Sequence, residues 1–345
     1  MNANSISMQD YWFPGSANQR AIFDFTNGVL EIESPGFPLV PEDSVNFGNV
    51  ITLSDNLGYY IIGKYLVDSN FTVVAGSDAI FNNANADVAN CAFAPVVNES
   101  NAAHLYFIDN AGLHYGHISQ NVFRHSTLDA LTLVPLTFAP AENSPLCILG
   151  DADGNGNWLF YFTVQDALFK LVTVYCEAAV ERSSTLLSAP DTELPVSMDI
   201  HKNKIALVYE SGRLVYGSLT AAGETMNVTL DGSITGLSAV FIQSAFSADS
   251  HSLFWITNDA GVHNLNHLNM ITGKITTTAV SGNYKALKRG PDDVIYGLSF
   301  KTQRSSTLLI VTPNNLANDF SVSEIFTPAN GGYFPATAWN VYTSS

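Results

Sequence analysis

The sequence predicts an all-β fold, because strand-like runs dominate the chain and convincing helical periodicity is absent. The runs are short, rich in β-branched and aromatic residues, and bounded by turn residues. Many of the turns combine Asp or Asn with Gly, and these residues tolerate the positive φ angles of tight hairpins. The clearest predicted strands are 50–55, 59–67, 104–110, 113–119, 157–164, 204–210, 213–219, 251–258 and 306–312.

The hairpins recur along the chain at a long and fairly even interval. Taking the first strand of each unit, we place the starts near Phe47, Cys91, Leu146, Val196, Ile242, Tyr284 and Pro335. A repeat of roughly 40–50 residues with four short strands is typical of one propeller blade. The sequence therefore predicts a β-propeller of seven four-stranded blades, with six or eight blades as alternatives.

The two ends of the chain are each too short to form a blade alone. Residues 11–33 contain strand-like runs at 20–25 and 28–33, and residues 333–343 contain one more. If both segments share one closing blade, the ring has no exposed sheet edge. No composition shift marks a domain boundary, so we expect a single domain over 1–345, with residues 1–10 as an N-terminal arm.

Composition and charge narrow the classes of partner. The chain has 345 residues and a formal net charge of −17, and only 13% of its residues are charged. An acidic surface repels nucleic-acid phosphates, so we expect no nucleic-acid partner. No run of apolar residues is long enough for membrane insertion. The low charge density and the absence of leader features at the N-terminus favour a virion or cell exterior reached without a cleaved signal peptide, and the cytoplasm is the alternative.

The three cysteines predict neither zinc binding nor a disulfide framework. Cys91, Cys147 and Cys176 are far apart in sequence and none belongs to a CxxC pair. We therefore expect three buried, reduced thiols that pack as small apolar side chains.

One loop resembles the start of a calcium site. Asp151, Asp153 and Asn155 alternate as the first ligands of a calcium loop do. The closing acid is missing, because Phe162 and Leu159 occupy the positions where longer and shorter calcium loops need a carboxylate. The favoured interpretation is a hairpin turn, and no cofactor is expected; calcium is the alternative.

Aromatic residues in loop-like contexts are the candidates for partner binding. They are Tyr11, Trp12, Phe37, Tyr333 and Phe334. Aromatic side chains supply large contact areas on sugars or proteins at a low entropic cost. The alternative for Trp12 is packing inside the closing blade.

Several segments resemble a known family. Residues 10–28, 151–162, 245–275 and 286–299 resemble the propeller-like domain near the N-terminus of Bacteroidetes surface proteins that are exported by type IX secretion and carry a gliding-type sorting tail. In 286–299, Asp293 stands where that family usually has Gly. The resemblance implies a propeller in an exposed location. The missing leader and sorting tail suggest a stand-alone version, such as a protein displayed on the virion of a phage.

The predicted function follows from the absence of catalytic motifs. We expect a non-enzymatic structural or interaction protein, displayed on a virion or cell surface, that binds a protein partner in a larger assembly or a host-surface glycan or protein. One alternative is a glycan-active propeller hydrolase or lyase that gathers acids such as Asp151, Asp153 or Asp249 in its central funnel. Another alternative is an intracellular scaffold propeller.

Overall fold

The computed structural model describes most of the middle of the chain and scattered strands near its two ends. The described residues are 11–12, 15–16, 19–20, 22–24, 31–33, 47–52, 58–62, 65–68, 72–77, 91–96, 99, 101–120, 125–129, 131–151, 156–187, 190–237, 244–282, 284–290, 293–299, 307–314 and 319–326. Every helix or strand found in these ranges is a β-strand, which confirms the predicted all-β class. This part of the chain holds no helix with the length and apolar character of a membrane span.

The first strands of the chain form two three-stranded antiparallel sheets and a short ribbon. One sheet has the strand order β1 (Tyr11–Trp12), β4 (Ile22–Asp24) and β5 (Glu31–Glu33). The ribbon pairs β2 (Gly15–Ser16) with β3 (Gln19–Arg20). The second sheet consists of β6 (Phe47–Thr52), β7 (Gly58–Ile62) and β8 (Tyr65–Asp68).

The next three sheets are larger antiparallel meanders. The first is five-stranded and contains β9 (Cys91–Pro95), β10 (Ala102–Asp109), β11 (Gly112–Gln120), β12 (Ser126–Leu128) and β13 (Thr132–Leu133). The second contains β14 (Cys147–Gly150), β15 (Asn157–Gln165), β16 (Leu168–Glu177) and β17 (Val180–Leu186). The third contains β18 (Ser197–His201), β19 (Lys204–Tyr209), β20 (Arg213–Ala222) and β21 (Thr225–Ile234).

Two further four-stranded sheets complete the described part of the chain. One contains β22 (Ala245–Phe246), β23 (Ser252–Asp259), β24 (Val262–Asn269) and β25 (Ile275–Val280). The other contains β26 (Tyr284–Arg289), β27 (Ile295–Ser299), β28 (Thr307–Asn314) and β29 (Asp319–Phe326).

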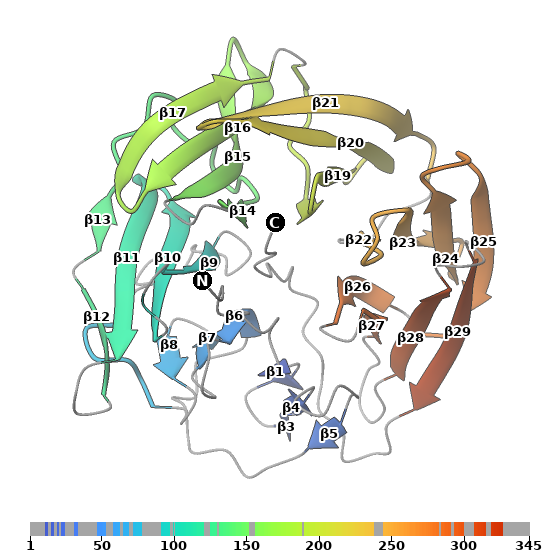
Figure 1. Cartoon of the computed structure of the whole chain (residues 1–345). Helices are drawn as coiled ribbons and strands as arrows, with labels where there is room; N and C mark the ends of the chain where they lie inside the picture. The colour runs from blue at the N-terminus through green and yellow to red at the C-terminus, as the bar shows by residue number, and fades with distance from the viewer. Residues whose placement is uncertain are drawn as a thin grey trace.

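The sheets are arranged radially around a common centre, with the first strand of each sheet innermost (Figure 1). The innermost strands contact one another in chain order, from β1 through β6, β9, β14, β18 and β22 to β26. This arrangement is a β-propeller, as predicted from the hairpin period.

The core lies between neighbouring sheets, because inner and middle strands such as β9, β15 and β23 bury both of their faces. In β9, Phe93 packs toward the preceding sheet, whereas its neighbours Ala92 and Ala94 pack with Tyr161 of the following sheet. Trp255 is fully buried on the face of β23 that meets the preceding sheet. Burial of both faces explains why these strands read as nearly continuous apolar runs.

The predicted strand positions are largely confirmed. The inner strands β6, β9 and β26 begin at the predicted residues, and β14 and β18 begin one residue later than predicted. The predicted starts at Ile242 and Pro335 lie outside the described residues. The predicted strand over 59–67 is wrong, because the structure has two strands there, β7 and β8, which pair as a hairpin.

The predicted four strands per blade are present in four sheets of the described chain, those that begin with β14, β18, β22 and β26. Two sheets have three strands and one has five. The shared closing blade stays a prediction: the segment 11–33 does supply β1, β4 and β5, but the predicted partner, residues 333–343, and the predicted arm, residues 1–10, lie outside the described residues.

Candidate functional site

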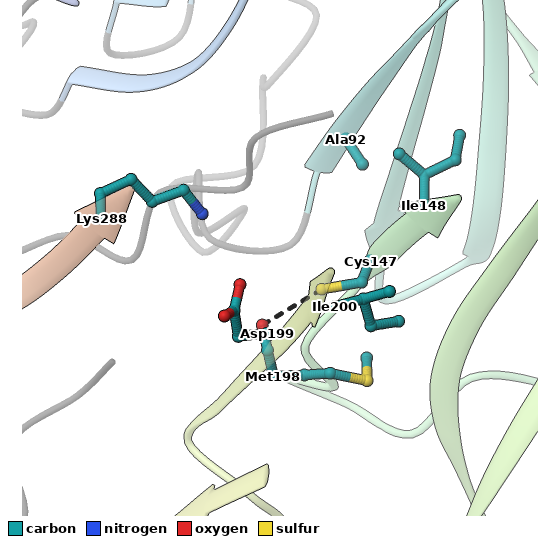
Figure 2. A pocket seen from close by; sticks show the side chains of 7 residues that line it. All are labelled: Ala92, Cys147, Ile148, Met198, Asp199, Ile200 and Lys288. Carbon is teal, nitrogen blue, oxygen red and sulfur yellow. Dashed lines mark hydrogen bonds between the residues drawn. The ribbon is translucent and has the colours of Figure 1, made fainter. Parts of the chain in front are cut away.

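A small cavity lies at the centre of the ring, where inner strands of four sheets converge. Its lining residues come from β9, β14, β18 and β26 and are Ala92, Cys147, Ile148, Met198, Asp199, Ile200 and Lys288. Its volume of about 10 Å³ corresponds to roughly one water molecule. Figure 2 shows the side chains of Asp199 and Lys288 pointing toward one another from different strands. The cavity therefore combines apolar walls with one acid and one amine.

Strand alternation places the charged residues at this centre. Met198 and Ile200 belong to the apolar cluster shared with the β14 sheet, so Asp199 between them points the other way. In β26, Leu287 packs in the apolar cluster shared with the β22 sheet, and Lys288 after it extends into the cavity. Asp199 and Lys288 keep some accessible surface because they border the cavity.

Asp199 is a carboxyl group that the protein surrounds. Burial raises its pKa above the usual value, and this effect outweighs the positive charges of Lys288 and Arg289. The backbone N–H of Phe246, in β22, donates to Asp199 Oδ2 at 3.2 Å. This hydrogen bond fixes the carboxyl group between two neighbouring sheets.

The pKa of Lys288 is shifted in the opposite direction to that of Asp199. Burial lowers its pKa, the charge of Arg289 lowers it further, and the opposing effects of Asp199 and Cys147 do not restore it. A raised carboxyl pKa and a lowered amine pKa both favour the uncharged forms of the two groups. Burial thus shifts both pKa values toward the range in which a carboxyl group and an amine exchange protons with a substrate.

Arg289 and His201 form a second polar contact next to this pair. Arg289 Nη2 donates to His201 Nδ1 at 2.8 Å, and His201 Nε2 lies 3.0 Å from the carbonyl oxygen of Ala248. Because Nδ1 accepts a hydrogen bond, the proton of the neutral ring is on Nε2, which donates to Ala248. Burial, followed by the charge of Arg289, lowers the pKa of His201 to about 4. Arg289 Nη1 also lies 3.2 Å from Asp293 Oδ1.

Cys147 also faces the cavity but is not a nucleophile. Its Sγ donates to the carbonyl oxygen of Met198 at 3.1 Å, the dashed contact in Figure 2. Burial raises the pKa of this thiol to about 12, so it stays protonated at neutral pH. All three cysteines are buried and none is in a disulfide, as the sequence predicts.

The predicted aromatic binding residues do not form a group in the described chain. Tyr11 and Trp12 lie in β1, where they pair with Asp24 and Phe23 of β4. Phe37, Tyr333 and Phe334 lie outside the described residues. Their role in binding stays a prediction.

The acidic loop after β14 is described only in part. Asp151 Oδ2 accepts a hydrogen bond from the Tyr175 hydroxyl at 2.7 Å, and the Asp151 backbone N–H donates to Gly156. Asp153 and Asn155 lie outside the described residues, so the calcium alternative stays untested. Within the described ranges no group of three or more His, Cys, Asp or Glu is placed to hold a metal ion.

The acid that lies at the centre is not among those predicted for a propeller hydrolase. Asp249 lies in the turn after β22, where it accepts hydrogen bonds from Ser247 Oγ at 2.6 Å and from the His251 backbone at 3.0 Å. Among the acids that the structure describes, Asp199 borders the central cavity, and sequence analysis missed it. Two features of the sequence could have indicated this site. Asp199 is a single acid between apolar residues in a predicted inner strand, and Lys288 and Arg289 are adjacent basic residues in another predicted inner strand.

Comparison of the sequence with protein-family models and with curated proteins finds no match. The fold resembles many solved structures. A Bacteroides uniformis protein assigned as a 6-phosphogluconolactonase is 10% identical, with a TM-score of 0.56 over 93% of this chain and 98% of that chain. The periplasmic gluconolactonase of Pseudomonas aeruginosa is 9% identical, with a TM-score of 0.56 over 94% and 97%. The WD40 domain of fission yeast SCAP is 12% identical, with a TM-score of 0.51 over 94% and 85%.

These neighbours correct the predicted function. The sequence favoured a non-enzymatic interaction protein, and that prediction is wrong because two of the neighbours are named as lactonases. The lactonase names agree better with the alternative from the sequence, a glycan-active propeller hydrolase or lyase. At these identities the likeness itself establishes only the shared fold.

Proposed function

We propose that this chain is a β-propeller hydrolase that opens an ester bond in a sugar-derived compound, such as a sugar lactone. The observation that carries the proposal is the Asp199–Lys288 pair at the central cavity. The lactonase names of two structural neighbours with the same fold support the choice of reaction. The named site is therefore the centre of the ring, where the inner strands converge.

The pair has the two functions that ester hydrolysis requires. A base must take a proton from the attacking water, and an acid must protonate the departing oxygen. In its uncharged form, the amine of Lys288 serves as the base and the carboxyl group of Asp199 as the acid. After the bond breaks, transfer of the proton from Lys288 to Asp199 restores both groups.

The size of the cavity sets how substrate and water are arranged in this proposal. A volume of about 10 Å³ admits a water molecule but not a sugar ring. The water is held beside Lys288, and the substrate presents its carbonyl group at the mouth of the cavity. Arg289 supplies a nearby positive charge for the oxygen that becomes negative in the transition state.

The test is lactone hydrolysis by the purified full chain, followed with a pH indicator and corrected for spontaneous ring opening. Glucono-1,5-lactone and its 6-phosphate are the first substrates. Asp199→Asn and Lys288→Met are each expected to lower the rate by about 10²–10⁴-fold, the usual contribution of acid–base groups. Asp259→Asn and Lys274→Met change exposed residues of the β23–β24 and β24–β25 hairpins and serve as matched controls.

Two results would count against the proposal. If the wild-type chain opens no lactone faster than the buffer does, the reaction class is wrong. If the wild-type chain is active and Asp199→Asn retains that activity, the reaction takes place elsewhere. Melting curves of each variant separate a lost active site from a lost fold.

A further inference from the structure

We propose that the ε-amine of Lys288 is a carbonyl-reactive nucleophile that forms an imine with a small aldehyde in the central cavity. This covalent chemistry goes beyond the proposed hydrolysis and does not depend on it. The inference concerns one lysine among the eight of the chain.

The geometry around Lys288 is that of an activated lysine. The cavity that its side chain borders is walled by apolar groups of Ala92, Ile148, Met198 and Ile200. Lysines become nucleophilic at neutral pH when they are desolvated in an apolar pocket or lie near another cation. Lys288 meets both conditions, because the charge of Arg289 acts on it within the same buried region.

The direction of its pKa agrees with this geometry. An amine attacks a carbonyl carbon only when it is uncharged, and burial of Lys288 lowers its pKa. The thiol of Cys147 borders the same cavity, but its pKa is raised to about 12 and its proton is donated to Met198. The amine, and not the thiol, is therefore the nucleophile available there.

The reaction balances with groups that are present. The nitrogen lone pair of Lys288 forms a bond to the aldehyde carbon, and a proton moves from nitrogen to oxygen to give a carbinolamine. Asp199, whose raised pKa favours its acid form, protonates the hydroxyl group, and the C–O bond breaks to release water. The iminium nitrogen returns a proton to Asp199, so one aldehyde and one amine yield one imine and one water, without an oxidant or a reductant.

Other lysines of the described chain lie in different surroundings. Lys202 donates to the carbonyl oxygen of Ala248 at 2.5 Å, and Lys204 donates to Ser218 Oγ at 2.8 Å. Lys274 is exposed in the hairpin between β24 and β25. These residues provide internal references for the reactivity of Lys288.

The experiment is reductive alkylation of the full chain with isotope-labelled formaldehyde and cyanoborohydride at pH 6.5, read by peptide mass spectrometry over time. Formaldehyde is the smallest aldehyde and needs the least widening of the cavity to reach Lys288. An amine with a lowered pKa has a larger uncharged fraction at this pH, and only the uncharged amine attacks the aldehyde. We therefore expect Lys288 to be labelled at a higher initial rate than Lys274 and Lys202.

Two variants test the roles of the neighbours. Asp199→Asn is expected to slow the labelling of Lys288 while leaving Lys274 unchanged, and Arg289→Gln is expected to slow it by removing the nearby charge. If Lys288 of the wild-type chain is labelled no faster than Lys274, the proposal is overturned. If labelling is fast and Asp199→Asn does not slow it, the assigned role of Asp199 is overturned. Because the readout is covalent labelling, the result does not depend on whether the chain hydrolyses lactones.

Discussion

Replacement of His201 by Gln is predicted to remove a specific part of the acid sensitivity of the fold. His201 is 5% exposed, and burial with the charge of Arg289 lowers its pKa from 6.5 to about 4. Between these two pH values the unfolded chain binds a proton at this residue and the folded chain does not. Stability therefore falls as the pH falls through this window.

The size of the effect follows from the two pKa values. A difference of one pKa unit corresponds to about 1.4 kcal/mol, so the fall from 6.5 to about 4 gives about 3 kcal/mol. A glutamine at this position has an oxygen that can accept from Arg289 and an amide N–H that can donate to Ala248, and it does not titrate. His201→Gln should thus lose about 3 kcal/mol less than the wild type between pH 7 and pH 4.

The assay is urea unfolding of both proteins at several pH values from 4 to 7. Other groups that titrate in this range, including the buried His104 with a pKa of about 4, are common to both proteins and cancel in the difference. His125→Gln, at an exposed position, is the control for the substitution itself. If the stability difference between wild type and His201→Gln does not change with pH, the neutral buried His201 is refuted.

Three further predictions concern stability and thiol access. Gly212→Ala should destabilise the fold by more than about 1 kcal/mol in urea unfolding, because a Cβ at Gly212 would lie 1.9 Å from the carbonyl oxygen of Leu237 and the φ angle is +81°. Gly223→Ala is the control and should destabilise the fold less, because the space around Gly223 is open. Burial raises the pKa of Glu324, but hydrogen bonds from Ser281 and Tyr284 outweigh burial and hold this pKa below its usual value. Glu324→Gln should therefore reduce the free energy of unfolding at pH 7 by about 1 kcal/mol, and this difference should disappear in acid. An equal difference at pH 3 and pH 7 would contradict the prediction. The three buried thiols should resist iodoacetamide at pH 8 in the native protein and react in denaturant, and rapid native alkylation seen by mass spectrometry would contradict their burial.

Most of the fold could be predicted from the sequence, because each blade is built from hairpins whose strands and turns are close together in the chain. Each hairpin has its own turn residues and its own apolar run, so β9 and β26 could be placed at the correct first residue. The error at β7 and β8 arose because an apolar run of 59–67 shows no break in hydrophobicity where the chain turns back.

The candidate site could not be predicted in the same way, because it depends on contacts between distant segments. Asp199 and Lys288 are 89 positions apart, and only the closing of the ring brings β18 and β26 to one centre. Neither residue belongs to a sequence motif. Asp151 and Asp249 were conspicuous in the sequence because they lie in turns. In the structure they accept hydrogen bonds from the hydroxyl groups of Tyr175 and Ser247, and neither acid lines the central cavity.

The titration of Lys288 tests most directly whether this residue can act as a base or a nucleophile at the central cavity. Carbon-13 NMR of the full chain labelled at lysine Cε reports the titration of each amine, and the Lys288→Arg variant identifies its signal. We expect Lys288 to titrate at a lower pH than an ordinary lysine side chain, whose pKa is about 10.4. If Lys288 titrates together with Lys274, the amine is charged at neutral pH, and neither the acid–base pair nor the imine chemistry can operate.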